Sequence, residues 1–272
     1  MLSHTLKFSK GAARPGSDSV ISELIKSFAL ERPFSRSLTP KWDLAVVLQA
    51  LTKPPFEPLD QAELKFLSWK TVFLLAFASA KRRSELHALS IEPDLLRFNS
   101  DGSVSLAFQP GFLAKNQLPS VLPEPFSIPS LLSICGPSDP DILLCPVRAL
   151  KAYIKATAVV RGKRNRLFIP TRGSQDISAA TISSWLASTI RRAYAHLSSE
   201  DRQLLQVRPH EIRALSSSWA FLNKVSLDDV LKAAFWRSSS TFSSFYLRSF
   251  SSQSGAIYSL GPLVAAQTIV SA

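Results

Sequence analysis

Four side chains that can act on a phosphodiester lie close together near the C-terminal end of the sequence. His210 and Arg213 are three positions apart, directly after a proline. Proline suits the start of a helix, and residues at i and i+3 share a helix face, so the imidazole and the guanidinium should project together. Trp236 and Tyr246 follow. A titratable ring, a cation, an indole donor and a phenol could together bind a phosphate and attack it.

A second group of cations follows the most apolar part of the chain. Residues 60–80 are predicted to form a long buried helix, with Asp60 as its N-cap and Glu63 completing a capping box. Lys81, Arg82 and Arg83 come directly after it. A basic helix end is favoured by the helix dipole alone. The alternative is an arginine held rigidly against a phosphate, because its planar fork suits bidentate contacts.

A short sheet is predicted between the two groups. The turn signal Asp101-Gly102 separates the apolar runs 95–98 and 104–108, and a further extended run follows at 126–128. This pattern indicates a small antiparallel sheet. Lys115 falls in the connection between the second and third strands, where a lysine is either solvated or available to a ligand.

Helices and one basic loop account for most of the remaining sequence. The loop contains Lys163, Arg164 and Arg166 and leads into the strand-like run 167–169. A solvated loop and a contact with a DNA backbone are both open interpretations, since DNA binding requires positive loops of this kind. The apolar periodicity and the capping residues predict helices over 19–30, 42–51, 146–160, 178–196, 227–235 and 240–247, in addition to one that starts at His210.

Composition narrows the class of partner. The 272 residues include 32 Lys and Arg against 20 Asp and Glu, a formal net charge of +12. A content of 46% hydrophobic residues predicts a globular protein, and the charge favours a polyanionic partner, either nucleic acid or an anionic membrane. The longest apolar run, 72–80, is too short to span a bilayer, which favours nucleic acid. Cys135 and Cys145 predict neither a disulfide framework nor a zinc site, so we expect reduced cysteines in an intracellular protein.

Taken in order, these residues resemble the tyrosine recombinases, also called phage-type integrases. The resemblance rests on an arginine box, a lysine in a β-turn, a His-x-x-Arg box, an aromatic residue or histidine, and a tyrosine near the C-terminus. Here these elements are Arg82-Arg83-Ser84-Glu85-Leu86, Lys115, His210-Glu211-Ile212-Arg213, Trp236 and Tyr246. The sequence around them is especially similar to recombinases of DIRS-type retrotransposons, at Trp42-Asp43-Leu44, Arg208-Pro209-His210-Glu211 and Trp236-Arg237-Ser238.

The resemblance implies an α+β, mainly α-helical catalytic domain with a small antiparallel sheet. We expect this domain to cover residues 36–250, preceded by a disordered or helical remnant and linker at 1–35 and followed by a tail at 251–272. The gap between Trp236 and Tyr246 is one residue longer than the common spacing in the family. Family members also carry an N-terminal core-binding domain, which we expect to be truncated or supplied by another protein.

The implied reaction is strand cleavage and rejoining through a 3′-phosphotyrosyl intermediate, without a metal or a cofactor, for integration of a mobile element. Tyr246 would be the nucleophile. Arg82 and Arg213 would hold the phosphate oxygens, Trp236 would donate to one, Lys115 would be the general acid and His210 the general base. Contacts to the DNA backbone would come from Arg83, Lys163, Arg164, Arg166 and Arg237.

The implied partner is double-stranded DNA, with self-assembly on it as a dimer to tetramer, in an intracellular, nuclear setting and without a membrane. Two alternatives stay open. One is a relic or domesticated copy that binds DNA without cutting it. The other, ranked lower, is an enzyme similar to type IB topoisomerases, whose larger DNA clamp is not evident in the sequence.

Overall fold

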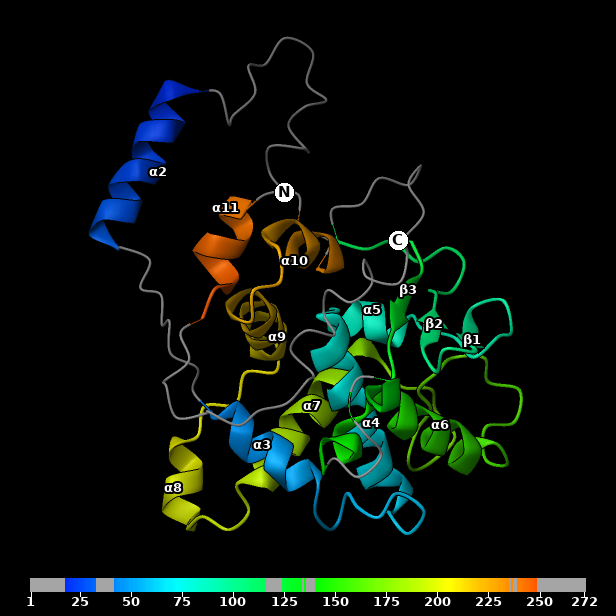
Figure 1. Cartoon of the computed structure of the whole chain (residues 1–272). Helices are drawn as coiled ribbons and strands as arrows, with labels where there is room; N and C mark the ends of the chain where they lie inside the picture. The colour runs from blue at the N-terminus through cyan, green and yellow to red at the C-terminus, as the bar shows by residue number, and fades with distance from the viewer. Residues whose placement is uncertain are drawn as a thin grey trace. The chain divides into compact units, whose positions relative to one another are not determined.

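The computed structural model describes residues 18–32, 42–115, 124–133, 135, 140–234, 236 and 239–248 (Figure 1). The chain divides into two compact units, Met1–Ser37 and Leu38–Ala272. The expected tail at 251–272 and most of the expected N-terminal remnant lie outside the described residues.

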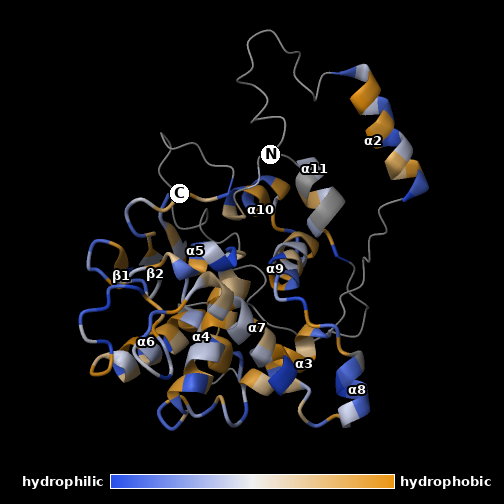
Figure 2. Ribbon diagram, turned by 180° about the vertical axis from the view of Figure 1, so that it is seen from behind, coloured by the Kyte–Doolittle hydropathy of each residue, from blue (hydrophilic) through white to orange (hydrophobic). Residues whose placement is uncertain are grey.

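The described part of the first unit is one amphipathic helix, α2 (Ser19–Glu31). Asp18 caps it, because its carboxylate accepts hydrogen bonds from Val20 N and Ile21 N, as a short acidic N-cap does. No residue of α2 is buried, and apolar and polar residues alternate along its ribbon (Figure 2). The helix predicted over 19–30 is confirmed.

The second unit is built around α4 (Leu64–Ser79), which packs against α6 (Pro146–Thr157), α7 (Ala179–Ala193) and α9 (Glu211–Leu222). α3 (Leu44–Leu51) packs against α7. Residues on every side of α4 are buried, which explains why its sequence is apolar throughout rather than amphipathic. Cys145 is free and buried, and its Sγ accepts a hydrogen bond from Arg148 N at the start of α6.

The predicted start of α4 is wrong. The helix begins at Leu64, and Glu63, at the N-cap position, makes no side-chain capping bond. Asp60 does not cap it, because the chain after Pro58 forms a turn in which Gln61 N and Ala62 N both donate to Pro58 O. The capping pattern in the sequence therefore marked this turn and not the helix end.

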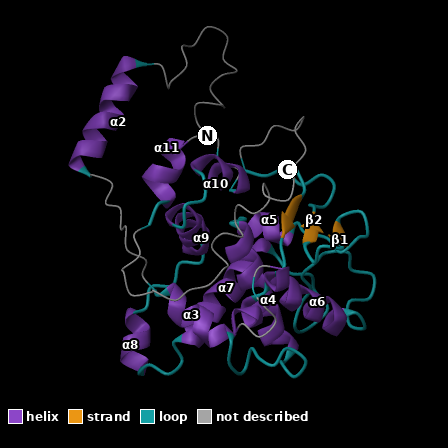
Figure 3. Cartoon of the chain, in the orientation of Figure 1, coloured by secondary structure: helices purple, strands orange, loops and turns teal. Residues whose placement is uncertain are grey.

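The predicted sheet is confirmed: β1 (Leu96–Phe98), β2 (Val104–Leu106) and β3 (Phe126–Ile128) are antiparallel in the order β1-β2-β3 (Figure 3). The side chains of Val104 and Leu106 are buried, as alternation in a half-buried strand requires. Residues 167–169 form no strand. Leu167 N donates to Leu89 O at 2.8 Å beside an isolated bridge between Ser90 and Arg166.

Several shorter helices and turns complete the second unit. Ser226 directly precedes the helix predicted over 227–235 and caps α10 (Leu227–Ala233), with Asp229 N donating to its Oγ at 3.1 Å. The tyrosine segment is a π-helical turn at Phe242–Tyr246. The remaining elements are α5 (Arg83–His87), α8 (Ser199–Leu204), α11 (Ser239–Thr241) and 3-10 turns at Leu131–Ser133 and Pro140–Leu144. Across the described ranges, no helix combines the length and apolar character needed to cross a membrane.

Candidate functional site

The turn between α4 and α5 fixes Arg82. Ala80 ends α4 in the left-handed region with φ 51°, and the chain then turns into α5. Glu85 is fully buried and accepts two hydrogen bonds from Arg82, one from its backbone N and one from Nη1, both at 2.7 Å. The Arg82 side chain is 22% exposed. It is therefore oriented by a buried carboxylate while its surface still reaches solvent.

Arg213 comes from α9 and joins the ends of two other helices. Its Nη1 donates to Ala80 O at 2.7 Å, and its Nη2 donates to Ala234 O just after α10. Nη1 also lies 3.7 Å from Glu85 Oε2. Glu85 therefore stands between the two arginines, a bridging role that the sequence pattern alone did not assign to it.

The electrostatic surroundings of Arg213 are those of a buried cation. Its pKa is lowered to about 10, first by burial and then by the positive charge of Arg82, while Glu85 and Tyr246 oppose the shift. Arg213 therefore keeps its charge at neutral pH.

Trp236 and Tyr246 meet the same guanidinium. Arg213 Cζ lies 4.8 Å from the Trp236 ring centroid and 5.7 Å from that of Tyr246. The two rings are 4.4 Å apart at 38°. Ser218 of α9 holds the tyrosine backbone, since its Oγ donates to Tyr246 O at 3.1 Å and accepts from Arg248 N at 2.8 Å. The π-helical turn, which holds one more residue per turn than an α-helix, accompanies the longer spacing between Trp236 and Tyr246.

We call Arg82, Glu85, Arg213, Trp236 and Tyr246 the arginine–tyrosine cluster. Two of its buried donors have no hydrogen-bond acceptor among the described residues: Arg213 Nε and Trp236 Nε1. A buried donor without a partner costs about 1–3 kcal/mol, so native proteins rarely keep one without a reason. An anion with several acceptor oxygens could satisfy both donors.

Lys81 is a further cation at this place, and its burial was not expected from the sequence. It is 3% exposed, and its Nζ donates to Ala233 O at 3.2 Å and lies 4.5 Å from the Phe126 ring centroid. Burial lowers its pKa from 10.5 to about 7, against the attraction of Glu85 and with the added repulsion of Arg213. The signal in the sequence was a lysine directly after the apolar run of α4.

Replacing Lys81 with methionine will change stability in a pH-dependent way. Between about pH 7 and 10.5 the unfolded chain binds a proton at Lys81 that the folded chain does not, so wild-type stability gains from rising pH in this window. The gain is absent in Lys81→Met. The free energy of unfolding of the variant minus that of wild type, measured by urea denaturation, should therefore be more positive at pH 6 than at pH 9. A difference that is the same at both pH values would contradict the burial of the ammonium group.

His210 lies at the N-cap position of α9, exposed, whereas Arg213 on the same helix is buried. Partial burial lowers the pKa of His210, with Arg208 and Arg248 adding to the effect and Glu211 opposing it. The imidazole is therefore neutral at pH 7 and able to accept a proton. Arg248 is two residues after Tyr246, so the electrostatic contact links His210 to the tyrosine segment.

The structure describes no contact between the cluster and Lys115, a predicted catalytic residue. Lys115 is exposed at the end of the range 42–115, and within the described residues no hydrogen bond or ion pair connects it to the cluster. Arg237 lies outside the described residues. Arg83 is exposed beside Arg82, as a contact to a large ligand requires.

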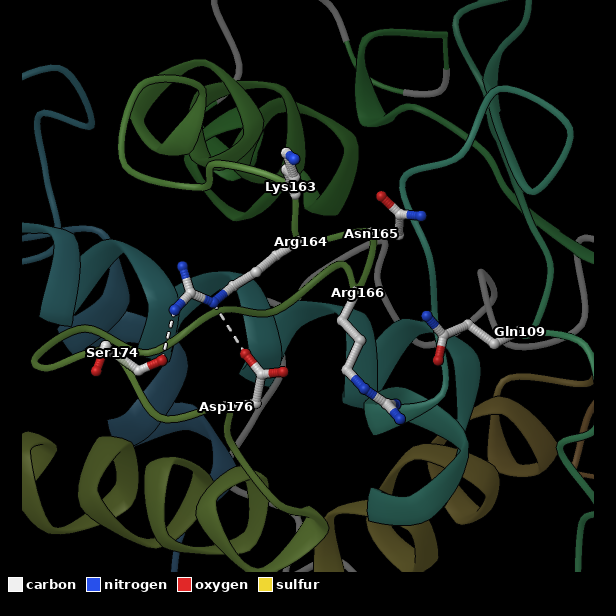
Figure 4. Close-up of a pocket in the computed structure, with 7 residues that line it drawn as sticks. All are labelled: Gln109, Lys163, Arg164, Asn165, Arg166, Ser174 and Asp176. Atoms are coloured by element: carbon white, nitrogen blue, oxygen red, sulfur yellow. Dashed lines mark hydrogen bonds and ion pairs between the residues drawn. The ribbon is translucent and has the colours of Figure 1, made fainter.

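The basic loop after α6 lines a separate polar pocket of about 600 Å³ (Figure 4). Arg164 is held there by Asp176, at 2.9 Å from Nε to Oδ1, and by Ser174 O at 2.5 Å. Arg166 Nη1 donates to His87 O at 3.0 Å. We call this site the basic pocket; its lining residues are Gln109, Lys163, Arg164, Asn165, Arg166, Ser174 and Asp176.

Arg161, in the same loop, is structural. It is buried, with Nη2 donating to Leu167 O at 3.0 Å and to Thr157 Oγ1 at 2.8 Å. It fixes the base of the loop and leaves only the later cations for a ligand.

Comparison with known proteins assigns no family: the chain matches no protein-family model, and no curated protein matches it.

Proposed function

We propose that this chain is a tyrosine-type DNA recombinase that cleaves and rejoins a DNA strand through a 3′-phosphotyrosyl intermediate. One observation carries the proposal. Three segments far apart in the sequence bring Arg82, Arg213 and Tyr246 together, with the buried Glu85 between the two arginines and Trp236 against Arg213 and Tyr246. These side chains are the phosphate ligands and the nucleophile that a metal-free transesterification needs.

In the proposed reaction, Tyr246 Oη forms a bond to the scissile phosphorus, and the bond from phosphorus to the 5′-oxygen breaks. The tyrosine proton passes to a base and the leaving 5′-oxygen takes up a proton. Charge builds up on the non-bridging oxygens, where Arg82, Arg213 Nε and Trp236 Nε1 would stabilise it. Loss of one such donor typically costs about 10²–10³ in rate.

His210 is the proposed base, since its lowered pKa keeps the imidazole neutral and ready to take the tyrosine proton. The role first expected for Lys115, protonation of the 5′-oxygen, stays a proposal.

Other tyrosines of the described chain are poorer nucleophiles. Tyr153 Oη is buried and accepts a hydrogen bond from Ile169 N at 3.0 Å, and burial raises its pKa. Tyr194 Oη accepts from Asp43 N at 2.6 Å, and burial raises its pKa as well. A phenol is a weak nucleophile at neutral pH, so a raised pKa makes it weaker still. Tyr246 beside Arg213 is the better candidate.

The basic pocket is the proposed second contact with the DNA backbone. Arg164 and Arg166 are already held by protein acceptors, so little conformational entropy is lost when they meet a phosphate. Lys163, exposed at the rim, adds a mobile charge. Arg83 and Arg237 are the further backbone contacts in the proposal.

Replacing Lys163 with glutamine should weaken DNA binding equally for all sequences and make it less sensitive to salt. The slope of log K against log salt should become less negative by about 0.9, the value for one phosphate contact. Fluorescence anisotropy over a salt series measures this slope. Lys155→Gln, at an exposed lysine of α6 outside the pocket, is the charge-matched control and should leave the slope unchanged. Equal slopes in Lys163→Gln and wild type would show that the basic pocket does not contact the DNA backbone through Lys163.

The partner in this proposal is double-stranded DNA, on which the chain assembles as a dimer to tetramer in the nucleus. The biological role proposed is integration of a mobile element. A type IB topoisomerase-like enzyme shares the chemistry and ranks below it.

One observation favours a second function, a DNA-binding protein that does not cut. Both Nη groups of Arg213 already bind backbone carbonyls, so much of this arginine serves the fold. A nicked suicide duplex separates the two functions, because the strand fragment that diffuses away traps the covalent intermediate. A protein–DNA band that survives denaturing electrophoresis supports the recombinase. Salt-sensitive binding without any such band supports the non-cutting protein.

A further inference from the structure

We infer that Lys81 couples occupation of the arginine–tyrosine cluster by a DNA phosphate to the uptake of a proton. The inference deepens the proposed function and rests on its phosphate-binding part. It adds a residue to which the resemblance gives no role. Lys81 acts on the site through charge and through the position of α10, and it is a positioning residue rather than a catalytic one.

The geometry places Lys81 at the point where three elements meet. It follows the left-handed Ala80 at the end of α4, its Nζ binds Ala233 O at the end of α10, and its ammonium faces the ring of Phe126 in β3. Arg213 binds the very next carbonyl, Ala234 O. The two cations therefore hold adjacent carbonyls, just before the segment that carries Trp236 and Tyr246.

Both cations and carboxylates of the described chain act on Lys81 in the free protein. The groups that act on it are Glu85 of α5, Arg82 before α5, Arg213 of α9 and Glu124 before β3. Glu85 is already shared by both arginines, and Glu124 is exposed. Among the described residues, the buried carboxylate of Glu85 is thus shared by the two arginines beside Lys81, and a bound anion would add negative charge to this group of cations.

A phosphate bound between the arginines would add negative charge close to Lys81. The ammonium form of Lys81 loses its hydration by burial and is repelled by Arg213, which is why its pKa lies at about 7 in the free protein. An anion between the arginines offsets this repulsion and raises the pKa. Lys81 then takes a proton from solvent when DNA binds, and by linkage the affinity for DNA falls as pH rises above about 7.

The test is isothermal titration of the full chain with a short duplex DNA at pH 8, in Tris and in HEPES. The two buffers have different ionisation enthalpies, so a difference in observed binding enthalpy measures the protons taken up. Wild type should take up roughly one proton at most, and its affinity should fall by up to about tenfold per pH unit above pH 7. No uptake by wild type would overturn the inference.

Three variants make the assignment specific. Lys81→Met removes the titrating group and should abolish the uptake. Lys81→Arg keeps a permanent charge, and should bind DNA with an affinity that no longer follows this pH dependence. Lys151→Met removes one exposed charge outside the cluster and should retain the full uptake of wild type. Undiminished uptake in Lys81→Met, or in Lys81→Arg if the methionine variant does not fold, would assign the proton to another group and overturn the inference.

This experiment measures binding, so its outcome is independent of strand cleavage. Uptake that depends on Lys81, found without any covalent adduct, supports the proton coupling and leaves the recombinase proposal refuted. A covalent adduct together with uptake that is unaffected by Lys81→Met refutes the coupling alone.

Discussion

A protein with Tyr246 replaced by phenylalanine will form no covalent adduct with a nicked duplex, and it will still fold and bind DNA as wild type does. The substitution removes only Oη, and the ring can keep its contact with Trp236, whose centroid lies 4.4 Å away. The backbone bond from Ser218 Oγ to the carbonyl of residue 246 is also unaffected. Loss of a catalytic nucleophile typically lowers the rate on the order of 10⁶-fold, so no adduct band should be visible.

Tyr194→Phe is the matched control for this experiment. It removes a phenol whose oxygen accepts a hydrogen bond from the backbone N of Asp43, a contact that involves no residue of the arginine–tyrosine cluster. The variant should therefore leave the adduct band unchanged. A band that persists in Tyr246→Phe would exclude Tyr246 as the nucleophile.

Replacing Arg213 with lysine will lower the rate of adduct formation about 10²–10³-fold, as expected for the loss of one oriented donor in the transition state. Lysine keeps the positive charge, but it has a single nitrogen and lacks the Nε donor that Arg213 leaves unpaired. It also cannot bind Ala80 O and Ala234 O with a fixed fork. The free energy of unfolding should therefore fall by about 1–3 kcal/mol, the cost of a buried group left without its partner.

Single-turnover cleavage and urea denaturation measure the two effects separately. Arg191→Lys is the control, because Arg191 is exposed on α7, outside the cluster and outside the proposed DNA contacts, and it should change neither the cleavage rate nor stability appreciably. A cleavage rate in Arg213→Lys close to that of wild type would reduce Arg213 to a purely structural residue.

Local patterns predicted most of the secondary structure. Ser226 caps α10, as its place before the predicted helix 227–235 indicates, because an N-cap bond involves only residues a few positions apart. The Asp101-Gly102 turn and its flanking apolar runs gave the β1–β2 pairing for the same reason. The short helix α8 was not predicted, since its six residues carry too little apolar periodicity.

Interactions between distant segments were beyond the reach of such patterns. Nothing local distinguishes Arg161, which is buried, from Lys163, which is exposed in the same loop. The burial of Lys81 depends on contacts with α10 and β3, which lie far away in the sequence. The false capping signal at Asp60 has a different, local origin, because a turn after Pro58, in which Gln61 N and Ala62 N donate to Pro58 O, precedes the helix.

The candidate site was predictable by residue type more than by role. The sequence singled out Arg82, Arg213, Trp236 and Tyr246, which meet in the structure. It did not indicate that Glu85 would bridge the arginines. Lys115 stays a prediction, since its position between β2 and β3 says nothing of where its side chain acts.

The central claim is that Tyr246 becomes joined to a DNA 3′-phosphate. The most direct test is to trap the adduct on a nicked suicide duplex, digest the protein and identify the modified peptide by mass spectrometry. The account predicts a single modified residue, Tyr246, carrying the 3′-phosphate of the cleaved strand. Attachment at Tyr153, Tyr194 or Tyr258, or DNA binding with no adduct at all, would contradict it.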